Sequence, residues 1–281
     1  MQETRGLPLI LSYFSSSYGV KQASAYGVDF SFCFAEAIMK CWICGDEGTT
    51  GEHRTKATDL RALFGEITQK SPIYFHTSRI KNIPVGSSKS DRFKSNAKIC
   101  SRCNGSLTQP YDKAWEKLSS YLLGNISQIT KTGRIDLSKV FPTAIGQALL
   151  NVHLYFVKLF GCLIVEHDVP IDIASFAHAI KVRTAHKNVF LAFGPRLGVM
   201  RHKFAGITPI DAVNKNGVPV FACWFYIVGA MAVDVIYSAD VEYMRAVRNF
   251  WHPDNATKML QLSQFKNNLQ LHPTRARGAH G

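Results

Sequence analysis

Two pairs of cysteines constrain this chain more than any other feature of its sequence. Cys41 and Cys44 form one C-x-x-C pair, and Cys100 and Cys103 form a second pair much later in the chain. Each pair can present two thiolates from one tight turn, so the four together can complete the tetrahedral ligand set of a structural zinc ion. This spacing is more typical of metal sites than of disulfides, which indicates a reducing compartment, and we expect a cytoplasmic protein.

The residues next to the cysteine pairs point beyond a structural zinc. On their own, the cysteines favour a purely structural zinc ribbon, because structural sites use all four ligands. However, Glu52 and His53 follow the first pair closely, and Asn104 stands directly after the second pair. This arrangement resembles the HNH endonuclease family, in which a His on the first strand, preceded by an acidic residue, faces an Asn or His just after the second cysteine pair. The resemblance covers residues 39–123.

The resemblance implies a ββα-metal fold, in which two strands and a helix grip one catalytic divalent metal while the cysteines hold a separate zinc. It also implies that His53 deprotonates water, and an unperturbed His pKa of about 6.5 leaves the neutral form available at physiological pH. Glu52 and Asn104 offer hard oxygen ligands, which suit Mg²⁺ or Mn²⁺ better than zinc. Neighbours on a strand point to opposite faces, so Glu52 and His53 converge only through a bulge, a strand end or a water.

Two further candidates belong to the same predicted site. In the family, a middle Asn orients the catalytic His; Ser95 stands at that position here, and Asn96 is one residue further on. A one-residue change in the preceding turn would bring Asn96 into place. Asp112 follows Asn104 near a predicted helix start, where it is either the third ligand of the divalent metal or an acidic residue that is favourable near a helix N-terminus.

The charge of the chain favours a polyanionic partner. Lys and Arg outnumber Asp and Glu by 33 to 20, which gives a formal net charge of +13. The excess is densest in residues 39–139, where the motifs lie. A basic surface of this kind attracts nucleic acid. We expect DNA as the partner, with RNA not excluded.

The chain divides into four segments by its sequence pattern. Residues 1–38 show no long periodic pattern, and because Met39 directly precedes the first cysteine pair, we interpret them as a disordered appendage or a mis-assigned start. Residues 39–123 form the predicted HNH nuclease module, residues 140–263 an α+β C-terminal domain, and residues 264–281 a flexible tail. The predicted fold class is α+β, with a ββα-metal zinc module followed by a helical and strand-rich domain.

Hydrophobic periodicity predicts the elements of these segments. An amphipathic helix is expected over 110–123, a long buried helix over 144–167 and another helix over 172–183. Strands are expected over 188–193, 198–206, 218–228 and 231–237, with Asn216-Gly217 as a hairpin turn. The apolar stretch Val218–Val233 is rich in β-formers and ends before the length that a membrane span needs, so we read two buried strands and no membrane segment.

These observations lead to one functional hypothesis and one alternative. The hypothesis is a metal-dependent HNH endonuclease that hydrolyses DNA phosphodiester bonds, by analogy a component of phage defence or of a mobile element. It would use a structural zinc and a catalytic Mg²⁺ or Mn²⁺, and its C-terminal domain would contact substrate or a protein partner. The alternative is a non-catalytic, zinc-stabilised module that binds nucleic acid or protein.

Overall fold

The computed structural model describes residues 9–11, 39–77, 79–195, 203–247, 250–255 and 257–263. The predicted tail, 264–281, lies outside the described residues. Residues 198–202 of the strand predicted over 198–206 also lie outside them. Of the predicted appendage 1–38, only Leu9–Leu11 are described, and they form strand β1, which pairs in parallel with β3. The described chain is mixed α+β, as predicted.

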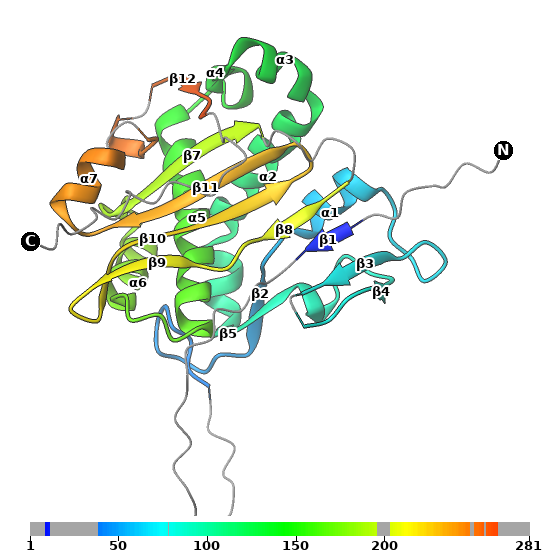
Figure 1. The fold of residues 1–281 in the computed structure, drawn as a ribbon, viewed down its shortest axis with the longest axis horizontal. Helices are drawn as coiled ribbons and strands as arrows, with labels where there is room; N and C mark the ends of the chain where they lie inside the picture. Colours follow the sequence, from blue (N-terminus) through cyan, green and yellow to red (C-terminus); the bar gives the residue numbers. More distant parts are fainter. Residues whose placement is uncertain are drawn as a thin grey trace, which may run out of the picture.

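A five-stranded antiparallel sheet forms one layer of the molecule (Figure 1). Its strands are β7 (Val189–Pro195), β8 (Ala205–Ile207), β9 (Asp211–Lys215), β10 (Val218–Val228) and β11 (Met231–Ser238). The order is β7-β11-β10-β8, and β9 also pairs with β10. The long apolar stretch thus folds as two paired strands, with Trp224 opposite Val235, which confirms the prediction.

The hairpin between β9 and β10 turns at the predicted residues. Asn216 and Gly217 have φ angles of 54° and 79°. Two successive positive φ angles are the requirement of a type I′ turn, which Asn and Gly tolerate best. The turn therefore fixes the register of this hairpin from local sequence alone.

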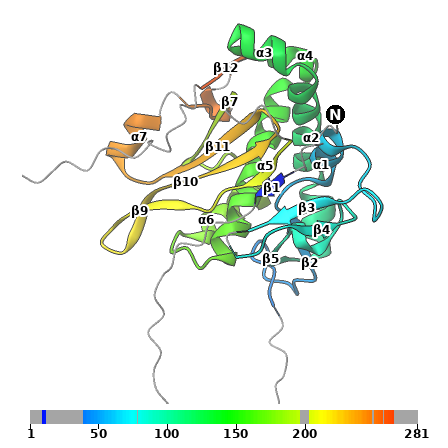
Figure 2. The ribbon, with the colours of Figure 1, turned by 45° about the vertical axis from the view of Figure 1, so that its right-hand side comes forward.

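Helices cover one face of the sheet, and α5 (Ile145–Glu166) lies at the centre of this layer (Figures 1 and 2). It packs against α2 (Gln109–Gly124), α6 (Ile173–Val182) and β5. All three predicted helices are confirmed, and every residue from Val152 to Ile164 is buried. Among the described residues α5 is the one helix long and apolar enough to span a membrane, and 78% of its apolar window is buried inside the molecule.

The remaining elements are short. A three-stranded sheet contains β1, β3 (Ile73–His76) and β4 (Ile83–Val85), and two-stranded pairs join β2 (Thr50–His53) to β5 (Lys94–Ile99) and β6 (Arg134–Asp136) to β12 (Met259–Gln261). The other helices are α1 (Ala57–Phe64), α3 (Ile126–Thr132), α4 (Leu137–Val140) and α7 (Val241–Val247). Single turns are formed by η1 (Asp91–Phe93), the π-helical η2 (Cys103–Leu107) and η3 (Pro253–Asn255).

One hydrophobic core runs from the cysteine region to the large sheet. At its centre Trp115 of α2 stacks on Tyr155 of α5, with ring centroids 5.5 Å apart, and Tyr226 of β10 packs edge-on against Trp115. Trp42, between the first two cysteines, lies against Gly161 of α5, where a Cβ would come within 2.3 Å of the indole. The predicted boundary between residues 123 and 140 therefore coincides with no break in the packing.

Candidate metal centre and active site

The four cysteines of the two pairs lie together in the structure. Their Sγ atoms are all within 4.8 Å of one another, and three of the four side chains are buried. This donor set could hold a metal ion such as zinc. Burial opposes ionisation at Cys100, but the Cys103 N–H, 3.3 Å away, and the neighbouring thiols lower its pKa to about 7. The thiolate form that a metal requires is thus favoured at this position.

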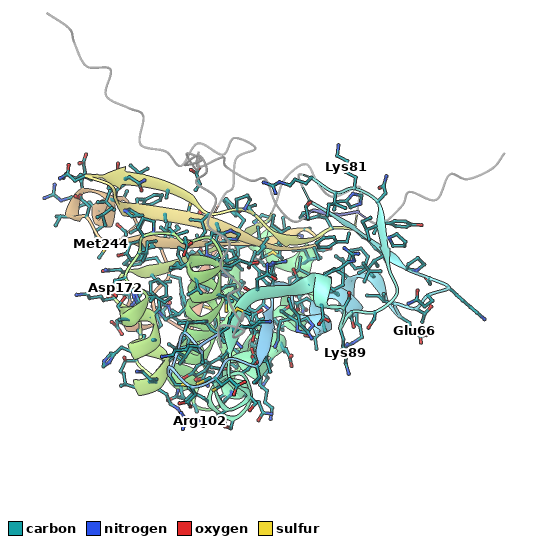
Figure 3. All side chains as sticks on the ribbon, turned by 90° about the horizontal axis from the view of Figure 1, so that it is seen from below. Glu66, Lys81, Lys89, Arg102, Asp172 and Met244 are labelled. Carbon is teal, nitrogen blue, oxygen red and sulfur yellow. The ribbon has the colours of Figure 1, made fainter. Side chains whose placement is uncertain are left out.

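The cluster joins two segments that are far apart in the sequence. The first pair lies in a turn closed by the Cys41 N–H, which donates to the Asp46 carbonyl at 2.7 Å. Cys100 directly follows β5, and Cys103 begins η2. Arg102, between them, forms an exposed ion pair with Asp46 at 3.3 Å, and Figure 3 shows it on the opposite side of α5 from Met244 of α7. A metal here would tie the end of β5 and the start of the following helix to the turn before β2.

Strands β2 and β5 pair antiparallel beside this cluster. The register places Thr50 opposite Ile99, and His53 opposite Lys94, with an irregularity between Gly51 and His53. The helical segment η2–α2 follows β5 directly, so the local order is strand, strand, helix. A bulge of the kind expected is present, yet Glu52 still points inward and is 4% exposed, whereas His53 is half-buried.

His53 is uncharged at neutral pH. Burial, followed by the charges of Lys94 and Lys56, lowers its pKa to about 4. Its Nε2 atom is buried and has no hydrogen-bond partner within the described part of the chain. A neutral imidazole with an unengaged nitrogen can accept a proton.

Glu52 and Asp112 converge on a lysine that the sequence did not suggest. The Lys158 Nζ atom of α5 lies 2.9 Å from Glu52 Oε2 and 2.8 Å from Asp112 Oδ1, and its side chain is fully buried. Asp112 Oδ1 also lies 3.1 Å from the Nζ atom of Lys56. Although burial works against its charge, the two carboxylates raise the pKa of Lys158 above its ordinary value.

Asn104 reaches the strand that carries Glu52 and His53. Its Nδ2 donates to Thr50 Oγ1 at 3.0 Å, and Thr50 lies two residues before Glu52 on β2. Thr108, one helical turn further, lies 3.4 Å from the Lys158 Nζ. Asn104, Thr108 and Asp112 are spaced at i, i+4 and i+8, so one face of the η2–α2 segment carries all three.

Asn96 is placed differently from Asn104. It is exposed, and within the described residues no hydrogen bond joins it to His53. Instead Ser95 is buried, and its Oγ donates to Glu166 Oε2 at 2.8 Å. Glu166, at the end of α5, also pairs with Arg54. The intervening turn therefore does not bring Asn96 to the site, and the inward position belongs to Ser95.

A second buried network holds Lys56 in place. The Lys56 N–H donates to Tyr226 Oη at 2.9 Å, and that hydroxyl donates to Asp59 Oδ2 at 2.6 Å. Asp59 also accepts hydrogen bonds from Trp115 Nε1, at 3.0 Å, and from Ser119. The backbone between β2 and α1 is thus anchored to the sheet, which positions the Lys56 side chain beside Asp112.

One signal in the sequence could have revealed Lys158. It is the one charged residue within the apolar run of residues 152–164, which forms a buried helix. A buried ammonium needs a carboxylate partner, and charged side chains are almost never fully buried unless paired. Such a lysine therefore predicts an acidic partner, although not which one.

The chain matches no known family, no curated protein and no solved structure to which it was compared.

Proposed function

We propose that this protein is an HNH-type endonuclease that hydrolyses DNA phosphodiester bonds. The observation that carries the proposal is the hydrogen bond between Asn104 Nδ2 and Thr50 Oγ1, at 3.0 Å. It ties the start of the helix to the strand that ends at His53, directly beside the four-cysteine cluster. The strand pair, the helix and a zinc held by the cysteines would then form the ββα module.

His53 is the base of the proposed reaction. Its lowered pKa of about 4 keeps the imidazole neutral, so it can take a proton from the attacking water at physiological pH. Lys94 and Lys56 both lie close enough to lower that pKa by their charge. The same two cations can bind a phosphate and offset the negative charge that develops on it.

The expected Mg²⁺ or Mn²⁺ does not fit the acidic residues as they are arranged. Two carboxylates and an amide are a suitable donor set for these ions. However, the Lys158 ammonium is within 2.9 Å of both carboxylates and takes the position that a shared cation would need. The steps assigned to His53, Lys56 and Lys94 therefore involve no divalent ion.

The same observation favours a second candidate. A zinc-stabilised nucleic-acid-binding module needs no catalytic metal, and a carboxylate pair neutralised by a lysine suits a structural role. The basic surface of the chain, at a net charge of +13, serves either function.

Cleavage of supercoiled plasmid separates the two functions. Zinc-loaded wild type, His53→Ala and the control His178→Ala, which alters an exposed residue of α6, are incubated in Mg²⁺, in Mn²⁺ and with neither ion added, with RNA in parallel. A mobility-shift assay measures binding for the same proteins. We expect wild type and the control to cleave in all three conditions, and His53→Ala to bind equally well while cleavage falls by about 10²-fold or more. Cleavage that persists unchanged in His53→Ala contradicts the mechanism, and binding without cleavage by wild type supports the second candidate.

A further inference from the structure

We propose that the Lys158 ammonium is the resident cation of the Glu52–Asp112 pair, and that this pair takes up a divalent cation only when the charge of Lys158 is removed. The inference goes beyond the proposed endonuclease and does not depend on it. It assigns a permanent, internal cation to the position where the sequence predicts an exchangeable metal ion.

The hydrogen-bonding capacity of the ammonium is completely used at this position. A lysine ammonium has three N–H donors. Lys158 has three oxygen acceptors: Glu52 Oε2 at 2.9 Å, Asp112 Oδ1 at 2.8 Å and Thr108 Oγ1 at 3.4 Å. The three oxygens come from β2, from α2 and from the residue before it, so the ammonium joins these segments to α5. A metal ion bound by the same oxygens would do the same.

The two carboxylates already have two cations of the chain beside them. Glu52 and Asp112 contribute two negative charges, and Lys158 and Lys56 contribute two positive charges within 3.1 Å of them, while the partly exposed Glu116 lies 3.7 Å from Lys56 Nζ. A divalent ion between the carboxylates would bring the count to four positive charges against three negative ones. At separations of a few ångströms in a poorly hydrated site this repulsion is large. The wild-type pair is therefore expected to exclude Mg²⁺ and Mn²⁺.

Lys158 is not placed to swing aside. Every residue from Val152 to Ile164 of α5 is buried, and the Lys158 side chain has no exposed surface. The Nζ atom also lies 5.9 Å from the centre of the Tyr155 ring, which is itself packed against Trp115. Moving the ammonium to water would require opening the centre of the core, so the pairing is a fixed part of the fold.

Replacing Lys158 by methionine, which is uncharged and one atom shorter, exposes the latent site. In Lys158→Met the two carboxylates and the Thr108 hydroxyl lose the Lys158 ammonium, while Asp112 keeps its contact with Lys56. Three oxygen ligands, with room made by the shorter side chain, are the donor set that Mg²⁺ and Mn²⁺ prefer. Glu52→Gln in the same background removes one of the two charges that would hold the ion.

Titration with Mn²⁺, followed by the electron paramagnetic resonance of the free ion, tests the assignment. The full chain, purified with zinc, is compared as wild type, Glu52→Gln, Lys158→Met, the double variant Glu52→Gln/Lys158→Met and the surface control Lys131→Met. We expect Lys158→Met to bind one Mn²⁺ at least about tenfold more tightly than wild type, and the double variant to lose this gain. Thermal unfolding of Lys158→Met should shift upward in Mn²⁺, while that of wild type and of Lys131→Met should not.

Two outcomes overturn the assignment. One is a folded Lys158→Met that binds Mn²⁺ no better than wild type. The other is a wild type that binds one Mn²⁺ which Glu52→Gln removes, and this comparison decides the matter even where Lys158→Met does not fold. None of these measurements uses DNA cleavage, so an inactive nuclease leaves the result unaffected.

Discussion

Two polar clusters lie beside the β2–β5 strand pair, and they are held together by opposite means. The four cysteines bring their Sγ atoms within 4.8 Å of one another and can be stabilised only by a cation from outside the chain. Glu52 and Asp112 are held by Lys158, a cation that belongs to the chain. Proximity of ligands therefore does not by itself define a metal site, because a cation of the chain can already occupy the position between them.

Removing a cysteine is the change with the largest expected effect, because the cysteine cluster has no internal substitute for its metal. Cys103→Ser should release zinc and destabilise the folded protein by roughly several kcal/mol, since metal binding supplies folding free energy at such sites. Zinc content, limited proteolysis and circular dichroism measure this. Cys223→Ser on β10, away from the cluster, is the control. A Cys103→Ser protein with full zinc and normal folding would contradict the claim that the cysteine cluster depends on a bound metal ion.

Removing Lys158 tests the claim that an internal cation holds Glu52 and Asp112 together. Lys158→Ala leaves Glu52, which is 4% exposed, without its partner, and the loss of one member of a buried ion pair costs roughly 3–5 kcal/mol. Urea unfolding of the zinc-loaded proteins, with no Mg²⁺ or Mn²⁺ added, measures the free energy of unfolding, with the exposed Lys131→Ala as control. A loss no greater than that of Lys131→Ala would show that the internal cation is dispensable.

A third buried cluster contains His153 and His186, whose Nε2 atom and backbone N–H are hydrogen-bonded at 3.0 Å. Its stability depends on pH because both imidazoles are buried in the neutral form. Burial lowers the pKa of His186 to about 4 and that of His153 well below its ordinary value. The folded protein keeps both neutral, while the unfolded chain takes up protons below about pH 6.5. Stability is therefore complete above that pH and falls by roughly 2–3 kcal/mol from His186 as the pH drops toward 4.

Urea midpoints measured between pH 7 and 4 test this dependence. His186→Asn should flatten the profile, whereas the exposed His178→Asn should leave its slope unchanged. Equal slopes in wild type and His186→Asn would assign the acid sensitivity to other groups.

The smallest expected effect concerns the contact that joins the cysteine turn to α5. In Gly161→Ala the new Cβ meets the indole of Trp42 and should cost roughly 1–3 kcal/mol. Gly146→Ala, in the same helix with open space around its Cβ, should be neutral or stabilising by up to about 1 kcal/mol. Differential scanning calorimetry and zinc content, measured together, show whether this contact couples the stability of the cysteine cluster to that of α5, which carries Lys158. Equal melting temperatures and zinc contents of the two variants would show that it does not.

The sequence by itself determined the local structure and the cysteine cluster. Apolar residues at helical spacing placed α2 and α5, and the Asn216-Gly217 turn, with its two positive φ angles, placed the β9–β10 hairpin. Each C-x-x-C pair fixes two thiolates within one turn, so only the meeting of the two pairs remained to be shown. These features depend on neighbours in the chain, and such patterns are readable without a fold.

Only the tertiary structure decided the partners of the acidic residues. Glu52, expected to hold a divalent ion, lies instead against Lys158, which is far away in the sequence, and Ser95 rather than Asn96 faces inward to Glu166. The sequence shows Lys158 as a charged residue within an apolar helix. The direction in which its side chain points depends on the orientation of α5 relative to β2 and α2. That orientation is set by the packing of large side chains such as Trp115 and Tyr155. The packed core therefore determines which carboxylates lie close enough to pair with the buried ammonium.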